Sequence, residues 1–333
     1  MRTIINNEND PYYNLALEET LLKSETAPDM LVWLWQNRPA VIIGRHQNAL
    51  EEVNIAAIRK RGIDVVRRIS GGGAVYHDSG NVNFTFIAPA RGKGEELFRR
   101  FTEPVIDALR SLGVPAEFTG RNDIVAGGKK ISGNAQAYYR DRMFHHGTLL
   151  FDSDLATVGA VLNAAPDKIK SKGVKSVRSR VANIRTYLKE DITIEEFKSR
   201  LLSRLLATDD IQSREYRLSP AEEETARRLA ADKYRTWEWN YGRSPAFETV
   251  KSGRFAGGKI TFHLDIKAGK IAACHIGGDF FGKLEIAGLE TALVGALFTP
   301  AAVAAVLDSV PLGDYLFNIA KEDILACLFN QTV

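Results

Sequence analysis

The sequence predicts an α+β protein with a mixed or antiparallel sheet, and three observations support this class. Strand-like and helical runs do not alternate strictly, as they would in a doubly wound parallel fold. Residues 118–152 instead read as consecutive hairpins, with Gly127-Gly128 and Arg140-Asp141 as turns. The 333 residues, 45% of them hydrophobic and 26% charged, exceed the usual size of a single hydrophobic core. We therefore expect about two domains.

The first elements along the chain mix short helices and strands. Residues 14–24 place Leu15, Glu18 and Leu21 at helical spacing, with Asn14 as the candidate N-cap. Apolar, β-branched runs then predict strands at residues 31–36, 40–44, 62–70, 74–77 and 81–88. A helix is expected over residues 94–113, with Pro104 as its one discordant residue.

The second half of the chain begins with helices and ends in a separate domain. Amphipathic helices are expected at 193–208 and 220–235, the latter opened by Ser219-Pro220. Near residues 242–250 the sequence changes to glycine-punctuated strands, which are followed by helical patterns at 285–297, 300–309 and 321–329. We expect a domain of residues 1–245 and a small α+β domain of residues 246–333.

Charge and cysteine content narrow the functional class. The 44 Lys and Arg residues against 41 Asp and Glu leave a net charge of +3, too balanced for a whole-chain nucleic-acid or membrane binder. Cys274 and Cys327 cannot form a disulfide framework. The sequence lacks a signal-peptide pattern and an apolar run of about 18–20 residues. We expect a cytoplasmic enzyme with no nucleic-acid or membrane partner.

The glycine triplet Gly71 to Gly73 predicts a loop whose backbone closely approaches a ligand. Consecutive glycines are kept where φ must be positive or where a ligand must touch the backbone. Their N–H groups, with Arg67 and Arg68 beside them, favour an anion. The loop matches neither GxGxxG in a strand-to-helix setting nor GxxxxGK[ST]. The alternative is a glycine-rich turn between two strands.

A second motif, residues 120–133, predicts a hairpin with a single inward lysine. Asp123 lies on one strand and Lys129-Lys130 on the other, and strand alternation sends only one of the lysines to a given face. An inward ammonium could stabilise charge that develops during phosphoryl or nucleotidyl transfer. The alternative is a pair of solvated hairpin lysines.

A third segment, residues 168–185, is strongly basic. It holds four lysines, three arginines and no acid, a local charge of +7. Such a segment fits a loop that closes over a nucleotide or docks an acidic protein, and also a solvated connector.

Two histidine-containing segments do not fit a metal site or a catalytic triad. Neighbouring strand residues face opposite ways, so His145 and His146 cannot share a metal, and no zinc or other protein-bound metal site is expected. His146 to Thr148 is interpreted as a sheet floor that touches a ligand. His77 and Asp78 have no nucleophilic Ser or Cys in a triad setting.

Taken together, these segments resemble the lipoate-protein ligase family. The resemblance rests on RRISGGGAVYHDSGNVNFTF, GRNDIVAGGKKISGNAQ, FHHGTLLF, KGVKSVRSRVANI, IIGRHQNALEEVN and NLALEETLL, and extends to the C-terminal KSGRFAGGKITFHLDIKAGKI. It implies a catalytic domain related to biotin and lipoate ligases, followed by an accessory domain. The implied activity is ATP-dependent conversion of lipoate or octanoate to an acyl-adenylate, then transfer to a lysine.

The resemblance also implies residue roles. Lys130, in a KxSG motif, grips both carboxylate and α-phosphate, and Asp123 lies beside it as a second catalytic residue. ATP or adenylate binding is implied for Arg68, Gly73, Ala74, Val75, Tyr76, Asn83, Lys130, Lys175, Ser176, Val177 and Arg178. Lipoate binding is expected of Leu15, Leu17, Arg67, Ser70, Gly71, Gly72, His77, Lys130, Gly147 and Thr148.

The expected cofactors are ATP and Mg²⁺, with lipoate as cosubstrate. The expected acceptors are lipoyl-domain proteins, namely acyltransferase subunits of 2-oxoacid dehydrogenases and the glycine-cleavage H protein, and the enzyme is expected to be a monomer. Three rival functions share parts of this pattern. An octanoyl- or lipoyl-transferase needs a cysteine nucleophile, yet both cysteines follow residue 270. A biotin-protein ligase would carry a GRGRxG pattern, which is absent. A binding homologue without activity is disfavoured by the retained Arg68, Asp123 and Lys130.

Overall fold

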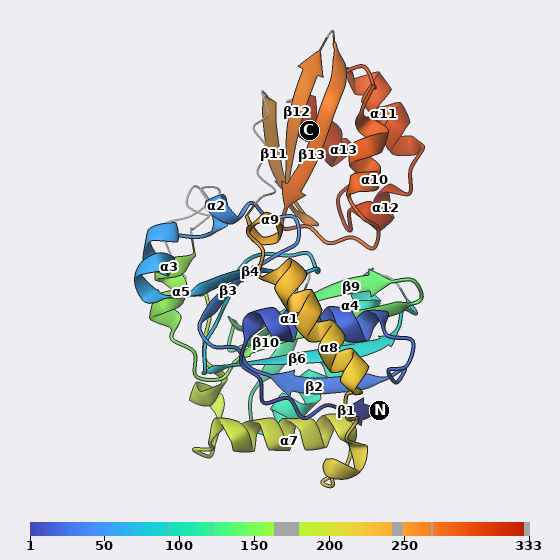
Figure 1. Ribbon diagram of the computed structural model, residues 1–333. Helices are drawn as coiled ribbons and strands as arrows, with labels where there is room; N and C mark the ends of the chain where they lie inside the picture. The colour runs from blue at the N-terminus through green and yellow to red at the C-terminus, as the bar shows by residue number, and fades with distance from the viewer. Residues whose placement is uncertain (93, 121, 163–179, 242–248, 268, 330–333) are drawn as a thin grey trace. The chain divides into compact units, whose positions relative to one another are not determined.

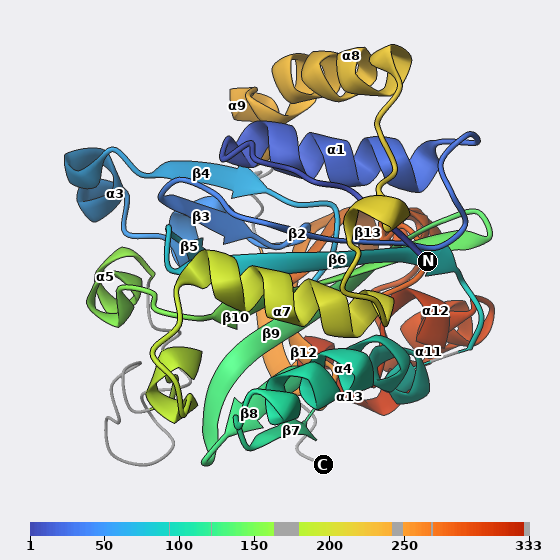
Figure 2. The ribbon, with the colours of Figure 1, turned by 90° about the horizontal axis from the view of Figure 1, so that it is seen from below.

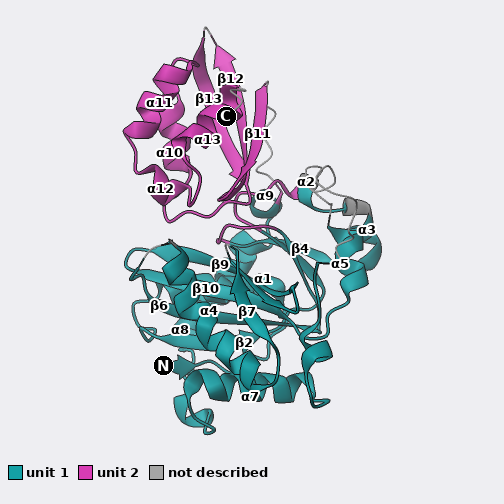
Figure 3. Cartoon of the chain, turned by 180° about the vertical axis from the view of Figure 1, so that it is seen from behind, with its two compact units in different colours: residues 1–43, 50–68, 74–240 teal, residues 44–49, 69–73, 241–333 magenta. Residues whose placement is uncertain are grey.

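The computed structural model describes residues 1–92, 94–120, 122–162, 180–241, 249–267 and 269–329 (Figure 1). The chain divides into two compact units (Figure 3). Unit 1 holds residues 1–43, 50–68 and 74–240, and unit 2 holds residues 44–49, 69–73 and 241–333. Two short loops that precede the predicted boundary therefore group with the C-terminal residues, because they hydrogen-bond to segments more than 200 positions away. His46 O accepts from the N–H of Gly278 at 2.8 Å.

Unit 1 is built on a mixed sheet whose described strands run in the order β1-β2-β6-β10-β9-β8-β7. All neighbouring pairs are antiparallel except β1 with β2. Both predicted hairpins are confirmed: Gly127 and Gly128 have φ of 54° and 74°, and Arg140 has φ of 53°. The strands are β1 (Arg2–Thr3), β2 (Leu31–Trp35), β6 (Asn81–Pro89), β7 (Ala116–Thr119), β8 (Asp123–Ala126), β9 (Lys129–Tyr139) and β10 (Arg142–Leu150).

Helices cover both faces of this sheet. Figure 2 shows α4 (Gly94–Ser111) and α7 (Ile194–Leu206) on one side, and α1 (Pro11–Lys23) with α8 (Pro220–Leu229) on the other. The α4 and α7 side holds the main apolar core, which includes Phe84, Phe86, Phe101 and Leu201. Pro104 is accommodated within α4, so the predicted helix is confirmed there.

Helix α1 begins earlier than the sequence predicted. Asp10 is the N-cap, and its side chain accepts from the N–H of Tyr12 at 3.2 Å. Pro11 occupies the first helical position, where its missing N–H costs nothing. The expected cap, Asn14, instead lies inside the first turns, and the assignment of Asn14 as N-cap was wrong.

Smaller elements complete unit 1. A second described sheet has the order β4-β3-β5. The predicted helix at 220–235 is α8 followed by a π-helical turn, η4 (Ala230–Tyr234). The remaining elements are β3 (Ala40–Ile43), α2 (Ala49–Glu52), α3 (Ile55–Arg61), β4 (Asp64–Arg67), β5 (Val75–His77), α5 (Leu155–Val161), η2 (Ile184–Tyr187), η3 (Gln212–Arg214) and α9 (Trp237–Asn240).

Unit 2 is α+β, as predicted for the C-terminal domain. Its described strands form an antiparallel sheet, β11-β12-β13, and its core includes Phe262, Phe280, Leu289 and Ile324. The first predicted helix is shorter than expected. The elements are β11 (Thr249–Phe255), β12 (Gly258–Lys267), β13 (Lys270–Gly278), α10 (Ala287–Leu293), α11 (Pro300–Asp308), α12 (Leu312–Tyr315) and α13 (Lys321–Phe329). Across the described parts of both units, no helix combines the length and apolarity needed to span a bilayer.

Candidate active site

The face of the large sheet that meets α1 is polar, although it is buried. Along β6, alternation sends Val82, Phe84 and Phe86 into the apolar core and turns the intervening polar residues the other way. Strand register places His146 beside Thr85 and Thr148 beside Asn83. A buried polar face in a sheet indicates a bound polar ligand or an internal network. Its buried members are Asn81, Asn83, Thr85, His146 and Thr148.

Helix α1 brings a buried carboxylate onto this polar face. Glu18 accepts hydrogen bonds from the Thr85 hydroxyl at 2.5 Å and from His146 Nδ1 at 3.0 Å. Trp35 Nε1 donates to Thr85 Oγ1 at 2.9 Å, which fixes the hydroxyl from the β2 side. Burial lowers the pKa of Arg68 to about 10, and the negative charge of nearby Glu18 partly opposes that shift. The buried arginine and the buried glutamate thus compensate each other's charge.

Several polar atoms of unit 1 are buried without a hydrogen-bond partner among the described residues. They include Nε2 of His77, Nδ2 of Asn83 and Oδ1 of Asn81. The other amide atoms of the two asparagines bond to each other, Nδ2 of Asn81 donating to Oδ1 of Asn83 at 2.9 Å. A buried group left unpaired costs about 1–3 kcal/mol. Two of the three, His77 and Asn83, were singled out from the sequence as ligand-binding residues.

His77 is held neutral in the interior of unit 1. It is 3% exposed, and Nδ1 lies 3.0 Å from Nδ2 of Asn37. Burial lowers the pKa of His77 to about 3, and the nearby charges of Arg68 and His146 lower it further. The imidazole therefore carries no charge at neutral pH, and it can act only as a hydrogen-bonding group or an apolar wall.

Lys130 and Asp123 form an ion pair at the start of β8 and β9. The Lys130 ammonium lies 2.7 Å from Asp123 Oδ1, and the two side chains are 36% and 33% exposed. The backbone of Lys130 is anchored separately, because its N–H donates to Arg180 O at 2.8 Å and its carbonyl accepts from Ala182 N at 3.0 Å. Lys129 is exposed. The two lysines therefore differ in exposure, as strand alternation predicts, and the role of Lys130 toward a ligand stays a prediction.

A β-bulge positions Lys130 over glycine. The β8–β9 register changes at Ile131, so that Lys130 pairs with Val125 and Ser132 with Ile124. The side chain of Lys130 consequently reaches Gly133, where a Cβ would lie 2.8 Å from its Nζ. The spacing Lys-x-Ser-Gly is thus explained by space for the ammonium.

Thr148 and Gly147 of β10 have different surroundings. Thr148 Oγ1 accepts from the N–H of Gly133 at 3.2 Å, which connects it to the lysine end of the site. A Cβ on Gly147 would lie 2.3 Å from Asn134 Oδ1 and 2.5 Å from Phe84 Cζ. Gly147 is therefore required by packing on the apolar side of the sheet, and Thr148 belongs to the polar side.

The two neighbouring arginines, Arg67 and Arg68, also differ in their hydrogen-bond partners. Arg67 is 1% exposed, and its guanidinium donates to the carbonyls of Trp239 at 2.8 Å and Asn240 at 2.9 Å. Arg68 donates to Ile42 O at 3.1 Å. Arg67 thus fastens α9 to the end of β4, whereas Arg68 lies close to Glu18.

The remaining predicted residues of unit 1 lie on α1 and around β5. Leu15 and Leu17 are 2% and 1% exposed within α1. Ala74 and Val75 are half-buried, and Tyr76 is buried. Burial raises the pKa of Tyr76 to about 12, with a further contribution from the Asp78 carboxylate.

The glycine triplet lies in unit 2. The carbonyl of Ser70 accepts from Arg45 N at 2.9 Å, and Gly72, with φ of 89°, donates its N–H to Phe280 O at 3.3 Å. A Cβ on Gly71 would lie 2.3 Å from Phe280 O, whereas one on Gly73 would meet nothing within 4 Å. Gly72 thus has the expected positive φ, whereas the close approach found at Gly71 is to the backbone of Phe280. Binding of a ligand by this loop stays a prediction.

The basic segment is only partly described. Lys175, Ser176, Val177 and Arg178, the predicted adenylate-binding stretch, lie outside the described residues. At its C-terminal end, Arg185 forms an ion pair with Asp152 at 3.2 Å and a second with Asp191. In the described portions of the chain no cluster of three or more His, Cys, Asp or Glu side chains could hold a metal ion.

Sequence reasoning missed Glu18, Thr85 and Asn37 as members of the buried network. The polar alternation Asn-Val-Asn-Phe-Thr at residues 81–85 was the available signal for Thr85. For Glu18 the available signal was its helical spacing with Leu15 and Leu21, which puts it on the apolar face of the helix. Asn37 gave none, since an asparagine in a turn is usually solvated.

Comparison with known families agrees with the resemblance. The family described as "Lipoyl protein ligase A/B catalytic domain" matches residues 10–206, and "Bacterial lipoate protein ligase C-terminus" matches residues 244–328. The chain is 48% identical to the lipoate-protein ligase LplJ of Bacillus subtilis, over 97% of this chain and 98% of that protein. It is 47% identical to lipoate-protein ligase 1 of Staphylococcus aureus, over 96% and 97% of the two chains.

The solved structures that are similar to this chain include lipoate-protein ligases. A lipoate-protein ligase A bound with ATP is 32% identical, with a TM-score of 0.61 over 72% of this chain and 98% of that one. A bipartite ligase from Thermoplasma acidophilum, described with its E2 lipoyl domain, is 32% identical, with a TM-score of 0.64 over 74% and 98%. P. falciparum LipL1 in complex with lipoate shares the fold, with a TM-score of 0.75 over 97% and 96% at 22% identity.

Proposed function

The chain belongs to the lipoate-protein ligase family, and on that premise we propose that it activates lipoate with ATP and transfers the lipoyl group to a protein lysine. The observation that carries this proposal is the Lys130–Asp123 pair beside the buried polar face of unit 1. An ammonium held by a carboxylate and seated over a glycine is preorganised for two anions that must approach each other. The fold and the family are those of enzymes that perform this ligation.

In the first step, a carboxylate oxygen of lipoate attacks the α-phosphorus of ATP, a P–O bond to pyrophosphate breaks, and the acyl-adenylate forms. Lys130 would contact the carboxylate and an α-phosphate oxygen together, reducing their repulsion and orienting the attack. Arg68 and the residues from Gly73 to Tyr76 would bind the nucleotide, together with Asn83, whose Nδ2 is an unpaired buried donor. The stretch from Lys175 to Arg178 is proposed to cover the adenylate and exclude water.

Mg²⁺ would enter this step with the triphosphate. Because no metal cluster exists among the described residues, a dedicated protein cage is not part of the proposal. Mg²⁺ commonly keeps several waters and binds one or two carboxylates plus substrate phosphates, and Asp123 is a carboxylate at the required end of the site. When bound, the ion would neutralise phosphate charge.

The acyl chain would occupy the interior beside α1. Leu15 and Leu17 are proposed as walls, together with His77 and Thr148. Gly147 faces the apolar side of the sheet and Arg67 bonds to α9, so neither is proposed as a wall. A lipoate-binding role for Ser70, Gly71 and Gly72 stays a prediction. Burial of about eight carbons at about 0.8 kcal/mol each contributes up to about 6 kcal/mol. This term favours lipoate and octanoate over short acids, but it does not separate the two.

In the second step, the neutral amine of an acceptor lysine attacks the acyl carbonyl and AMP leaves. Family members act on lipoyl-domain proteins, and one structural relative is described with its E2 lipoyl domain. We propose as acceptors the acyltransferase subunits of 2-oxoacid dehydrogenases and the glycine-cleavage H protein. Docking by the basic segment 168–185 stays a prediction, as do the monomeric state and the cytoplasmic location.

The transferase alternative is disfavoured by the cysteines. Acyl transfer through a thioester needs a reactive thiolate. Burial raises the pKa of Cys274 to about 12 and that of Cys327 to about 11, and the Glu290 carboxylate adds to the shift at Cys274. Both thiols are therefore protonated and inert at neutral pH.

A direct test is exchange of labelled pyrophosphate into ATP, which should require lipoate. Purified lipoyl domain should then gain one lipoyl group in an ATP-dependent reaction, followed by intact-protein mass spectrometry. Exchange that ignores lipoate, or acyl transfer from an acyl-carrier protein without nucleotide, would contradict the proposed function.

A further inference from the structure

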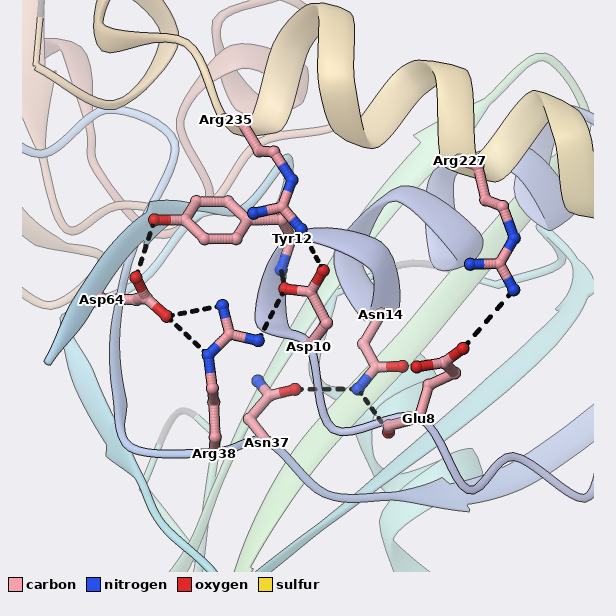
Figure 4. Close-up of polar contacts among 9 residues, drawn as sticks. All are labelled: Glu8, Asp10, Tyr12, Asn14, Asn37, Arg38, Asp64, Arg227 and Arg235. Carbon is pink, nitrogen blue, oxygen red and sulfur yellow. Dashed lines mark hydrogen bonds and ion pairs between the residues drawn. The ribbon is translucent and has the colours of Figure 1, made fainter.

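Asn14 settles the orientation of a neighbouring amide. Its Nδ2 donates to two backbone carbonyls, Glu8 O and Gln36 O, each at 3.0 Å, and its Oδ1 accepts from Asn6 at 2.8 Å. Backbone carbonyls can only accept, so the assignment of N and O in Asn14 is unambiguous. Asn14 Nδ2 also lies 2.9 Å from Asn37, so one of its two N–H groups is shared between two acceptors. An NH2 group of Asn37 could not accept there, and the atom that faces Asn14 is therefore Oδ1 (Figure 4).

The orientation of Asn37 fixes the tautomer of His77. With Oδ1 turned to Asn14, the amide nitrogen of Asn37 faces His77 Nδ1 at 3.0 Å and donates to it. A neutral imidazole whose Nδ1 accepts carries its proton on Nε2. Nε2 is the atom that is buried without a partner among the described side chains and backbone groups. His77 therefore presents an unpaired N–H donor inside unit 1.

Charged residues around the hydrogen bonds from Asn14 to His77 hold the two asparagines in place. Arg38 follows Asn37 directly and bonds to Asp64 at 2.9 Å and to Asp10 at 3.1 Å, and Tyr12 donates to Asp64 at 3.0 Å (Figure 4). The turn that carries Asn37 is thus fixed to the N-terminal end of α1 and to β4. The amide has little freedom to rotate away from His77.

The exposure of the site residues distinguishes its two ends. The Lys130 side chain is 36% exposed, as the end that meets ATP and an acceptor lysine must be. His77 is 3% exposed and close enough to Arg68 and His146 for their charges to act on it. The proposed function places the substrate carboxylate at Lys130 and His77 in the wall of the acyl site, and on that premise the far end of the substrate lies in the interior. In lipoate that end is a five-membered ring with two sulfur atoms, whereas in octanoate it is a methyl group.

We propose that Asn37, oriented by Asn14, is a positioning residue that fixes His77 as the Nε2–H tautomer, and that this N–H selects the sulfur-containing ring of lipoate over an alkyl chain. The inference rests on the proposed function and extends it to substrate choice. A ring sulfur is a weak acceptor for the N–H. A methyl group offers no acceptor, so octanoate leaves the buried donor unpaired.

The tautomer is tested first, in the free protein, by ¹⁵N NMR of protein labelled on histidine, with the His77 signals assigned by their loss in His77→Leu. The wild type should show a protonated Nε2 and an unprotonated Nδ1. In Asn37→Asp, one carboxylate oxygen can still accept from Asn14 and the other requires a proton on Nδ1, so the pattern should reverse. A wild-type spectrum with the proton on Nδ1 would overturn the proposal, whether or not the protein is a ligase.

Substrate choice is tested by the KM for lipoate and for octanoate in pyrophosphate exchange. Asn37→Asp should raise the KM for lipoate about 3- to 10-fold, with octanoate changing less than about 2-fold and kcat unaltered, since one hydrogen bond is replaced by a repulsive lone pair. Asn54→Ala removes an N-cap of α3, where Oδ1 accepts from Ala57 N at 3.1 Å, and should leave the KM ratio unchanged.

Folding of each variant is checked by thermal unfolding. If Asn37→Asp does not fold, His77→Leu replaces the donor with an apolar group and should likewise weaken lipoate selectively. An unchanged ratio of the two KM values in the folded variant refutes the selection role. Absence of lipoate-dependent exchange in the wild type would instead refute the proposed function, and the NMR result would still decide the tautomer.

Discussion

Lys130 and Gly133 lie against each other although they are three residues apart on one strand. Regular alternation would send their side chains to opposite faces, but the bulge at Ile131 brings the Lys130 ammonium to the face on which the Cβ of residue 133 would stand. Asp123, opposite Gly133 in register, completes the arrangement at 2.7 Å from the ammonium.

We expect Gly133→Ala to displace the ammonium of Lys130, because the new Cβ would lie 2.8 Å from Nζ and 3.0 Å from Cε. The lysine end is flexible, so stability should change by less than about 1 kcal/mol, whereas kcat for pyrophosphate exchange should fall roughly tenfold or more. Gly159→Ala, at a helical glycine with open space around it, is the control and should retain full activity. Full activity of Gly133→Ala would mean that the observed lysine position is not the reactive one.

Lys130→Ala should lower the rate of adenylate formation by about 100-fold or more, the usual effect of removing a preorganised group that stabilises developing charge. The side chain is partly exposed, so the thermal unfolding midpoint should change little. Lys129→Ala, at the exposed neighbouring position, should keep both activity and stability. Loss of adenylate formation in Lys129→Ala but not in Lys130→Ala would show that the catalytic role was assigned to the wrong lysine.

Gly71→Ala and Gly73→Ala should separate structural from binding roles within the glycine triplet. The first places a Cβ 2.3 Å from Phe280 O and should lower the free energy of unfolding by about 1–3 kcal/mol, as other overpacked sites do. The second has open space and should remain within about 0.5 kcal/mol of the wild type. Urea unfolding of both proteins measures the difference, and equal losses would contradict the packing described for unit 2.

His145 should make stability depend on pH. It is buried among aromatic rings, Nδ1 lies 3.0 Å from Gln136 Nε2, and burial holds its pKa well below the usual value. The unfolded chain therefore takes up a proton first as pH falls. The contribution of neutral, buried His145 to the free energy of unfolding is complete above about pH 6.5. It is lost progressively below that pH, by roughly 1 kcal/mol per pH unit.

The check on His145 is urea unfolding at pH 7, 6 and 5 for the wild type and His145→Gln. The variant should be less stable at pH 7, but its stability should decline less steeply with acid. Parallel pH profiles for the two proteins would show that His145 is not buried neutral in the folded state.

Local chemistry determined much of the secondary structure. Gly127-Gly128 specified a hairpin because both positions need positive φ, and alternation at Lys129-Lys130 allowed one lysine to turn inward. The motifs around Arg68, Asp123 and Lys130 indicated the family and the activity. Pro11, by contrast, shifted the start of α1 ahead of the expected cap at Asn14, since proline occupies the first helical position without loss of a hydrogen bond.

The tertiary structure alone decided which polar residues meet. Glu18 reaches Thr85 and His146 across 67 and 128 positions, and Asn37 reaches His77 across 40, distances in sequence over which no periodicity acts. Arg67 and Arg68 are neighbours of identical chemistry, yet one fastens α9 and the other lies near a buried glutamate. Sequence determines which face of an element is polar; which group on another element satisfies that face is decided only when the elements pack and water is removed.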